Sequence, residues 1–267
     1  MDKENELKQK TLDKSDVLTN DYIYDWAIKL AEGALARKLP VKLLGATAFI
    51  NRCPENRELY FKFGRRLTDV DVMTYSSVKS EEIDNFFAEQ GFEKQQHYIW
   101  HASTRDLFLN TDGLLVDVFR DKLEFCHTVH FKNRLNSDLL TIPLEEMVLQ
   151  KLQIVQINDK DFKDLSVLFL EHAVADGSKD SIDSAYIANL LAKDWGFYHT
   201  SKTNLTKLKD YLSEIPLLTD ENKIFIRQQI DQLIAAIEEA PKSLTWKLRS
   251  KVGTRMKWYN EVEEIQR

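Results

Sequence analysis

The first half of the chain mixes apolar residues at helical spacing with apolar residues at strand spacing. Helical spacing over 21–39 predicts a helix that ends before Pro40, and a second helix is expected over 80–90, capped by Ser80 and ended by Gly91. Runs at strand spacing predict strands over 41–44, 59–75, 97–100, 106–110, 114–120 and 139–142. A turn at 45–47 and a short helix from Ala48 are expected between the first two strands.

The second half of the chain has helical spacing almost throughout. Pro143 suits the first position of a helix, and apolar stripes follow over 144–155, 162–169, 187–191, 205–212 and 226–237. The expected fold class is α+β: a mixed sheet with flanking helices, followed by a C-terminal helical bundle. We place the boundary between an α/β domain at 1–142 and a helical domain at 143–267.

Composition and charge narrow the class of partner. The 267 residues carry a net charge of −6, which disfavours loose binding to bulk DNA because such binding depends on neutralising phosphates. The charged first twenty residues contain no apolar run of signal-peptide length, and no later stretch has the length of a membrane span. We therefore expect a cytoplasmic protein that does not bind membranes, with Cys53 and Cys126 as reduced thiols.

Three carboxylates stand inside apolar, strand-like sequence. Asp69 and Asp71 alternate with Val70 and Val72, so both acids are expected on one face of a strand. Asp117 lies between Val116 and Val118 in a second run, and completes the cluster if the two strands are neighbours in register. Carboxylates in such surroundings need a cation, and three of them suit a hard ion such as Mg²⁺. A phosphoryl- or nucleotidyl-transfer site is the expected use.

The order of three motifs strengthens this interpretation. Leu43-Leu44-Gly45-Ala46-Thr47-Ala48, Thr68-Asp69-Val70-Asp71 and Val116-Asp117-Val118 together resemble the nucleotidyltransferase superfamily with the polymerase-β-like core. Within it the chain is most similar to minimal and abortive-infection-type bacterial proteins. Two later stretches, 149–154 and 160–165, are similar to the helical continuation of that group, and the segments at 194–205 and 246–259 resemble one bacterial branch of it.

The resemblance implies a role for each matching residue. The backbone around Gly45 would approach nucleotide phosphates; Ala46 stands where the family usually has glycine or serine, and Thr47 is a candidate to supply the missing hydroxyl. Asp69, Asp71 and Asp117 would be the catalytic metal ligands, holding two Mg²⁺ ions. The further nucleotide-binding candidates are Arg65, Arg66, Thr68, Lys151 and either Asp161 or Asp164.

Plainer interpretations accompany several of these residues. Arg65 and Arg66 suit a solvated surface equally well, and helix-surface salt bridges are the ordinary role for Lys151 and the two aspartates. The basic, aromatic segment 242–260 is a candidate for nucleotide or RNA contact, or a helix whose aromatics dock on the body. The histidine pairs 97/101 and 127/130 have no third ligand at zinc spacing.

The combined prediction is a Mg²⁺-dependent transferase that moves a nucleoside monophosphate from a nucleoside triphosphate to an unidentified hydroxyl acceptor, which is a small molecule, tRNA or protein. Two alternatives stay open at this point: a non-catalytic module of the same fold that binds a nucleotide or a protein, and a toxin-type enzyme that acts on tRNA or protein.

Overall fold

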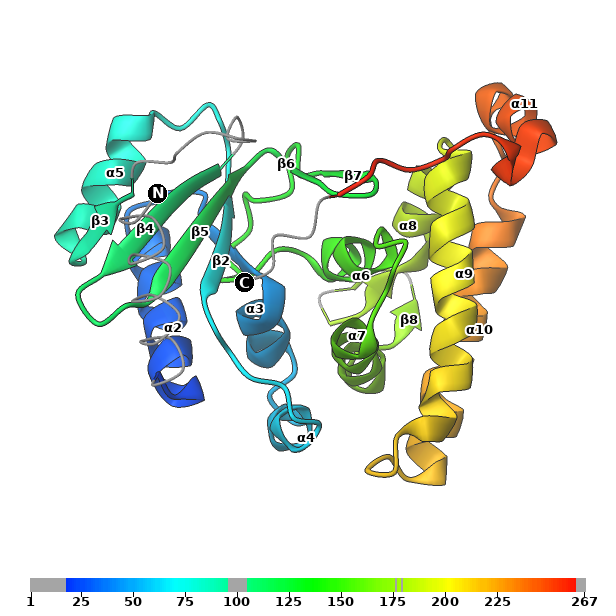
Figure 1. Ribbon diagram of the computed structural model, residues 1–267, viewed down its shortest axis with the longest axis horizontal. Coiled ribbons are helices and arrows are strands. Elements are labelled where there is room, and N and C mark those ends of the chain that lie inside the picture. The colour runs from blue at the N-terminus through cyan, green and yellow to red at the C-terminus, as the bar shows by residue number, and fades with distance from the viewer. Residues whose placement is uncertain (1–17, 96–104, 176, 179, 263–267) are drawn as a thin grey trace, which may run out of the picture.

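A five-stranded mixed sheet forms the core of the N-terminal half. The computed structural model describes residues 18–95, 105–175, 177–178 and 180–262 (Figure 1). The spatial order of the strands is β1 (Lys42–Leu44), β2 (Val70–Thr74), β5 (Leu115–Arg120), β4 (Arg105–Asn110) and β3 (Phe92–Lys94). Strands β2 and β5 run parallel, and the other neighbouring pairs are antiparallel. The predicted α+β class, with a mixed sheet followed by C-terminal helices, is confirmed.

The two faces of this sheet differ in what covers them. Val70, Val72, Val116 and Val118 are fully buried on one face. Phe108 of β4 pairs with Val116 and stacks on Phe87 of α5 (Ser80–Glu89), with 4.4 Å between ring centroids, so the valine face lies under α5. Side chains alternate along a strand, and the aspartates of β2 and β5 therefore lie on the opposite face.

Helix α2 (Asn20–Ala36) packs against β1 and α5 through small and aliphatic residues at helical spacing, namely Ile23, Ala27, Leu30, Ala31 and Ala34. It ends three residues earlier than predicted. Lys38 has φ +58°, in the left-handed region, and the Leu39 amide donates to the Ala34 carbonyl at 2.9 Å. These bonds satisfy the last carbonyls of the helix before Pro40 is reached.

Two sequence predictions between β1 and β2 were wrong. Gly45 does not form a turn ahead of the helix; it is the first residue of α3 (Gly45–Arg52). The predicted strand over 59–75 contains helix α4 (Arg57–Lys62), a loop, and only then β2. Tyr60 explains the difference, because its ring is 1% exposed where α4 packs against the C-terminal helices, and tertiary burial outweighs the β propensity of this aromatic run.

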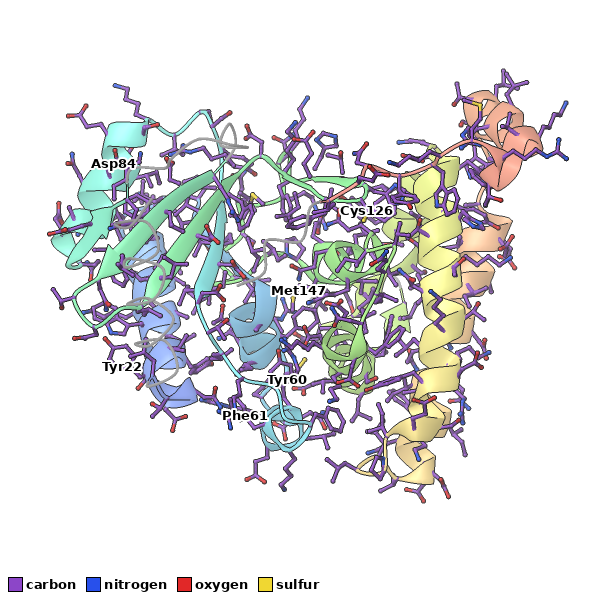
Figure 2. The ribbon with its side chains drawn as sticks, in the orientation of Figure 1. Tyr22, Tyr60, Phe61, Asp84, Cys126 and Met147 are labelled. Atoms are coloured by element: carbon purple, nitrogen blue, oxygen red, sulfur yellow. The ribbon has the colours of Figure 1, made fainter. Side chains whose placement is uncertain are left out.

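Helices make up most of the described part of the C-terminal half. They are α6 (Leu144–Leu152), α7 (Asp159–Glu171), α8 (Ser184–Leu191), α9 (Trp195–Tyr211), α10 (Asp220–Glu239) and α11 (Leu244–Val252). Short 3-10 turns follow α9 and α11, η1 (Leu212–Glu214) and η2 (Gly253–Arg255). Helix α3 packs on α6 and α7, and Figure 2 shows side chains, Met147 and Tyr60 among them, filling the space between these helices. The two halves are thus joined beside α3.

Short strands outside the main sheet were not predicted. They are β6 (Lys122–Glu124) with β7 (Thr128–His130), and β8 (Val174–Ala175) with β9 (Ile182–Asp183). The strand expected over 139–142 is reduced to a single bridge between Leu43 and Thr141. Pro143 precedes α6 as its cap residue instead of beginning it. The domain boundary placed at 142/143 stays a prediction.

The strand predicted over 97–100 lies outside the described residues. Within the described part of the chain, no helix combines the length and the apolar character needed to cross a membrane.

Candidate metal and nucleotide site

The parallel pairing of β2 and β5 brings the three predicted carboxylates together. Asp71 and Asp117 are direct partners in the register, and Asp69 precedes β2 by one residue on the same face. One carboxylate oxygen from each lies within 4.8 Å of the other two. Among the residues that the structure describes, no other group of histidine, cysteine, aspartate or glutamate side chains is arranged to hold a metal. The convergence anticipated from the sequence is present, and the role of the cluster as metal ligand stays a prediction.

The cluster is graded in burial. Asp117 is fully buried, while Asp69 and Asp71 are half-buried. The exposed Thr68 donates its hydroxyl to Asp69 Oδ1 at 3.0 Å, which holds that carboxylate at the entrance of the cluster. One side of the cluster is therefore open to solvent and the other is enclosed by the sheet.

An arginine that sequence analysis missed supplies a positive charge. Arg105 begins β4, two residues before the position opposite Asp117, and its Nη1 lies 3.5 Å from Asp117 Oδ2. A guanidinium at this distance offsets part of the repulsion between the carboxylates. Arg105 lies two residues from Leu107, the residue opposite Asp117, and so shares its face of the sheet. This pairing cannot be read from the sequence without the register of β4 and β5.

Gly45 places the backbone of α3 directly against Asp71. Its φ of +64° lies in the left-handed region, and a Cβ atom built on it would lie 2.3 Å from Asp71 Oδ2. No other residue type fits this position without moving the carboxylate. The N-terminus of α3, whose first amides have no partner within the helix and which is the positive end of its dipole, therefore borders the carboxylate cluster.

The two residues after Gly45 contribute less. Ala46 is half-buried and has no polar side chain, and the Thr47 hydroxyl is buried and donates to the Leu44 carbonyl at 3.2 Å. The Thr47 hydroxyl is thus used inside the first turn of α3. The nucleotide-binding roles predicted for both residues stay predictions.

A second missed residue reaches this helix end from the other half of the chain. Gln150 of α6 is 6% exposed, and its Oε1 accepts from the Gly45 amide at 3.4 Å. Its Nε2 is buried and has no hydrogen-bond partner among the described residues. The stretch 149–154 was noted in the sequence, but no role was predicted for Gln150, because the contact joins residues 105 positions apart.

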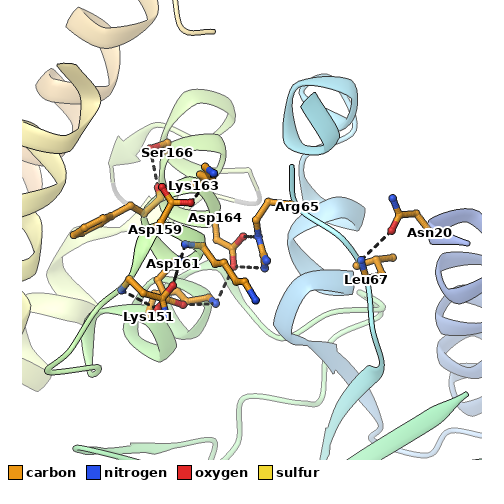
Figure 3. A network of polar contacts seen from close by, with 12 residues as sticks. Asn20, Arg65, Leu67, Lys151, Asp159, Asp161, Lys163, Asp164 and Ser166 are labelled. Carbon is orange, nitrogen blue, oxygen red and sulfur yellow. Dashed lines mark hydrogen bonds and ion pairs between the residues drawn. The ribbon is translucent and has the colours of Figure 1, made fainter. Parts of the chain in front are cut away.

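Four of the predicted nucleotide-binding residues form one ion network between the halves (Figure 3). Lys151 Nζ lies 2.9 Å from Asp161 Oδ1 and 2.8 Å from Asp164 Oδ2, and Arg65 Nε lies 2.6 Å from Asp164 Oδ1. Two cations balance two anions, as burial requires. The nucleotide-binding roles predicted for these residues stay predictions. Both aspartates contact Lys151, so the alternative between Asp161 and Asp164 stays open.

The electrostatics of this network follow from its pairing. Burial lowers the pKa of Lys151, but the two carboxylates outweigh it and raise that pKa above its ordinary value. Burial raises the pKa of Asp164, but Lys151 and Arg65 outweigh it and hold that pKa below its ordinary value. Both shifts favour the charged forms of Lys151 and Asp164.

The same network fixes the loop that leads to Asp69. Arg65 is tied to α7, and the Leu67 amide donates to Asn20 Oδ1 of α2 at 2.9 Å, as Figure 3 shows. Arg66, between these anchors, is exposed. The loop is therefore attached at two points just before the carboxylates, which sets where β2 begins.

The histidines considered as zinc ligands and the two cysteines considered as nucleophiles, where the structure describes them, have structural contacts or are buried. His127 Nε2 lies 2.8 Å from Thr200 Oγ1 and the ring stacks on Phe197. His97 and His101 lie outside the described residues. Cys53 is buried and Cys126 half-buried, and both are free thiols. Burial raises the pKa of the Cys53 thiol, which makes it a poor nucleophile.

The aromatic residues of the basic segment 242–260 mostly face the protein. Trp258 donates to Thr200 Oγ1 at 3.1 Å, and the Trp246 ring packs edge-on against Tyr198 of α9. Arg249 lies over the Trp195 ring and donates to the Gly253 carbonyl at 2.6 Å. These contacts agree with the interpretation that the aromatic side chains of this segment pack on the body of the protein.

Comparison with known proteins finds similarity among solved structures alone. No protein-family model matches the chain, and no curated protein sequence is significantly similar to it. Among solved structures, the antibiotic-resistance factor ANT(2'')-Ia, an aminoglycoside nucleotidyltransferase, aligns over 82% of this chain and 96% of its own, with 14% identity and a TM-score of 0.34. A TM-score of this size does not establish a shared fold, so the functional argument rests on the geometry of the site.

Proposed function

We propose that this protein is a nucleotidyltransferase that uses Mg²⁺ to move a nucleoside monophosphate from a nucleoside triphosphate to a hydroxyl acceptor. One observation carries the proposal: three carboxylates within 4.8 Å of one another lie against the N-terminus of α3, at a glycine with no room for a side chain. The carboxylates suit a divalent cation, and the helix end suits the phosphates that accompany it.

The donor set fits Mg²⁺. It consists of carboxylate oxygens alone, and the half-buried Asp69 and Asp71 leave one side of the cluster open to water and substrate. Asp69 and Asp71 would hold the ions, with Asp117 sharing the second. When bound, Mg²⁺ neutralises the charge that builds up on the reacting phosphate and on the departing pyrophosphate.

Residues of the chain would bind and orient the donor. The first amides of α3, beginning with Gly45, would donate to phosphate oxygens, as helix N-termini do in many nucleotide sites. Arg105 offsets charge beside Asp117, and Arg66 and Thr68 lie exposed at the start of β2, where they would meet the triphosphate. We retain Arg65, Lys151, Asp161 and Asp164 as proposed nucleotide-site residues. Their ion pairs also attach the loop before Asp69 to α6 and α7.

The proposed reaction exchanges one phosphorus–oxygen bond for another. The acceptor oxygen bonds to the α-phosphorus, the bond from the α-phosphorus to the oxygen that bridges to the β-phosphorus breaks, and pyrophosphate leaves. The proton of the acceptor hydroxyl passes to a carboxylate oxygen of Asp117. Positioning and charge neutralisation supply most of the rate enhancement in chemistry of this kind.

Labelled nucleotides test the proposal. Purified protein is incubated with each nucleoside triphosphate, labelled at the α-phosphate, with Mg²⁺ and cell extract, and the labelled molecule is identified. We expect transfer by the wild type and by Asp210→Asn, an exposed aspartate on α9, and none by the double variant Asp69→Asn/Asp71→Asn. Transfer by the double variant at the wild-type rate would refute the mechanism.

The assay also separates the alternatives. Label on tRNA or on a protein would identify a macromolecular acceptor, as the toxin-type alternative requires. Calorimetry with each nucleoside triphosphate, with and without Mg²⁺, tests the other alternative. Binding that does not depend on Mg²⁺, together with no transfer, would favour the non-catalytic module.

A further inference from the structure

We propose that Gln150 is a phosphate-binding residue contributed by the C-terminal helices. Its side-chain amide would donate to a phosphate oxygen of the bound nucleotide beside Gly45. This inference rests on the proposed function. It adds, directly beside Gly45, a further contact from the helical half of the chain, to which the proposed site residue Lys151 also belongs.

The position of the amide is the first argument. Gln150 Oε1 lies 3.4 Å from the Gly45 amide nitrogen, and Gly45 in turn adjoins Asp71. Because Oε1 and Nε2 are bonded to the same carbon, Nε2 lies at the same end of α3. The side-chain amide of Gln150 therefore lies between α6, which carries it, and the N-terminus of α3.

The hydrogen-bond inventory is the second argument. A glutamine amide has two N–H donors, and Gln150 Nε2 is buried with no partner among the described residues. A buried donor that lacks a partner is costly, and native proteins seldom keep one without a use. Exchanging the amide oxygen and nitrogen does not remove the problem, since it would turn N–H groups toward the Gly45 N–H. An anion at the end of α3 would accept from Nε2 and satisfy it.

A purely structural role predicts a different pattern. Gln229 shows that pattern in this protein, because its Oε1 accepts from the Val174 amide at 2.7 Å, a short bond that completes a strand. The 3.4 Å contact of Gln150 is long by comparison. It leaves the Gly45 N–H weakly bound and available to a better acceptor, such as a phosphate oxygen.

The inference describes an exchange of partners on binding. Without nucleotide, Gln150 Oε1 partly occupies the Gly45 N–H. With nucleotide, a phosphate oxygen accepts from the Gly45 N–H, and Gln150 Nε2 donates to the same triphosphate. The Gly45 N–H and Gln150 Nε2 then each donate a hydrogen bond to the triphosphate, and the triphosphate links α3 to α6.

Substitution of Gln150 tests this directly. Gln150→Met keeps the length of the side chain and removes the donor, and Gln150→Glu replaces the donor with a negative charge. A hydrogen bond to a charged group corresponds to about 10- to 100-fold in affinity. We expect Gln150→Met to weaken binding of a non-hydrolysable nucleoside triphosphate with Mg²⁺ by about that factor, and Gln150→Glu to weaken it further.

The matched control is Gln153→Met. Gln153 is the C-cap residue of the same helix and is fully buried. Neither its amide nitrogen nor its amide oxygen has a hydrogen-bond partner among the described residues, so it makes no hydrogen bond to Gly45. We expect its affinity for nucleotide to equal that of the wild type. Urea unfolding of all variants establishes that the proteins compared are folded.

Binding is measured by calorimetry, first with the nucleoside triphosphate analogue and then with inorganic tripolyphosphate as the probe, each with Mg²⁺. If Gln150 binds a phosphate group, Gln150→Met must weaken the binding of both probes. In ¹H–¹⁵N spectra of the wild type, tripolyphosphate should shift the Gly45 amide and the Gln150 side-chain amide together.

The outcomes separate this inference from the proposed function. A wild-type protein that binds neither probe overturns both. A wild type that binds, with Gln150→Met binding equally well, overturns the role of Gln150 and leaves the proposed function standing. Equal losses in Gln150→Met and Gln153→Met also overturn it, since they would reflect packing of α6 and not a contact with phosphate.

Discussion

Replacing Gly45 by alanine perturbs the site at the point where helix and carboxylates meet. Two effects combine in Gly45→Ala. The residue has φ +64°, a conformation that costs an L-residue about 1–2 kcal/mol, and its new Cβ would lie 2.3 Å from Asp71 Oδ2. The carboxylate must rotate away, at a cost of about 0.5–1.5 kcal/mol if it leaves its rotamer. We expect a total loss of about 1.5–3.5 kcal/mol in the free energy of unfolding.

Gly64→Ala separates the two effects. Gly64 lies in the loop before β2, has φ +77°, and a Cβ built on it meets no atom within 4 Å. It therefore carries the backbone cost without the clash. We expect Gly64→Ala to lose only about 1–2 kcal/mol and to keep the metal affinity of the wild type. Gly45→Ala should lose about 10- to 100-fold in Mg²⁺ affinity, the usual effect of disturbing the residue that orients a ligand.

The assay is urea unfolding for stability and calorimetry for Mg²⁺ in the presence of a nucleoside triphosphate analogue. Repeating Gly45→Ala in an Asp71→Ala background removes the clashing oxygens, so the stability cost there should fall toward that of Gly64→Ala. Unchanged metal affinity in Gly45→Ala, or an equal loss in Gly64→Ala, would refute the reasoning that Gly45 positions Asp71.

Three further predictions concern charges. Arg105→Gln removes the cation beside Asp117, so added Mg²⁺ should raise the melting temperature of this variant more than that of the wild type; an equal rise would contradict the role of Arg105 as a counter-ion. Asp164→Leu leaves Lys151 and Arg65 without their shared partner and should cost about 3–5 kcal/mol in urea unfolding, whereas a loss below 1 kcal/mol would show that the network is dispensable. Burial lowers the pKa of His127 from 6.5 to about 4, so between these two values His127 is protonated in the unfolded chain and neutral in the folded chain. The free energy of unfolding should therefore fall by about 2 kcal/mol between pH 7 and pH 5. His127→Asn should remove most of that fall, unlike His130→Asn on the exposed side of the same hairpin, and an unchanged fall would exclude His127 as its cause.

The carboxylate cluster was accessible from sequence because its signal is local. Val70 and Val72 alternate with Asp69 and Asp71, and the same pattern recurs around Asp117. Alternation fixes the face of each acid once both runs are strands, since burial of the valines excludes the opposite register. Only the pairing of β2 with β5 had to be assumed, and the structure has it in register.

The errors have a common cause in tertiary contacts. The run Leu59-Tyr60-Phe61 favours a strand by composition, yet α4 forms there because Tyr60 is buried where α4 packs against the C-terminal helices. Strand propensity depends on the surface that a residue packs against, which the local sequence does not contain.

The missed site residues show the same limit at longer range. Arg105 meets Asp117 only through the register of β4 with β5, and Gln150 meets Gly45 across 105 positions. Neither residue differs from an ordinary surface arginine or helix glutamine in sequence. Their positions became visible only when the two halves were assembled around α3.

The most direct test of the account is a crystal structure with Mn²⁺ in place of Mg²⁺ and a non-hydrolysable nucleoside triphosphate. We expect anomalous density for manganese between Asp69, Asp71 and Asp117, with the phosphates at the Gly45 end of α3. Manganese bound elsewhere, or a nucleotide held away from these three carboxylates, would contradict the assignment of this site.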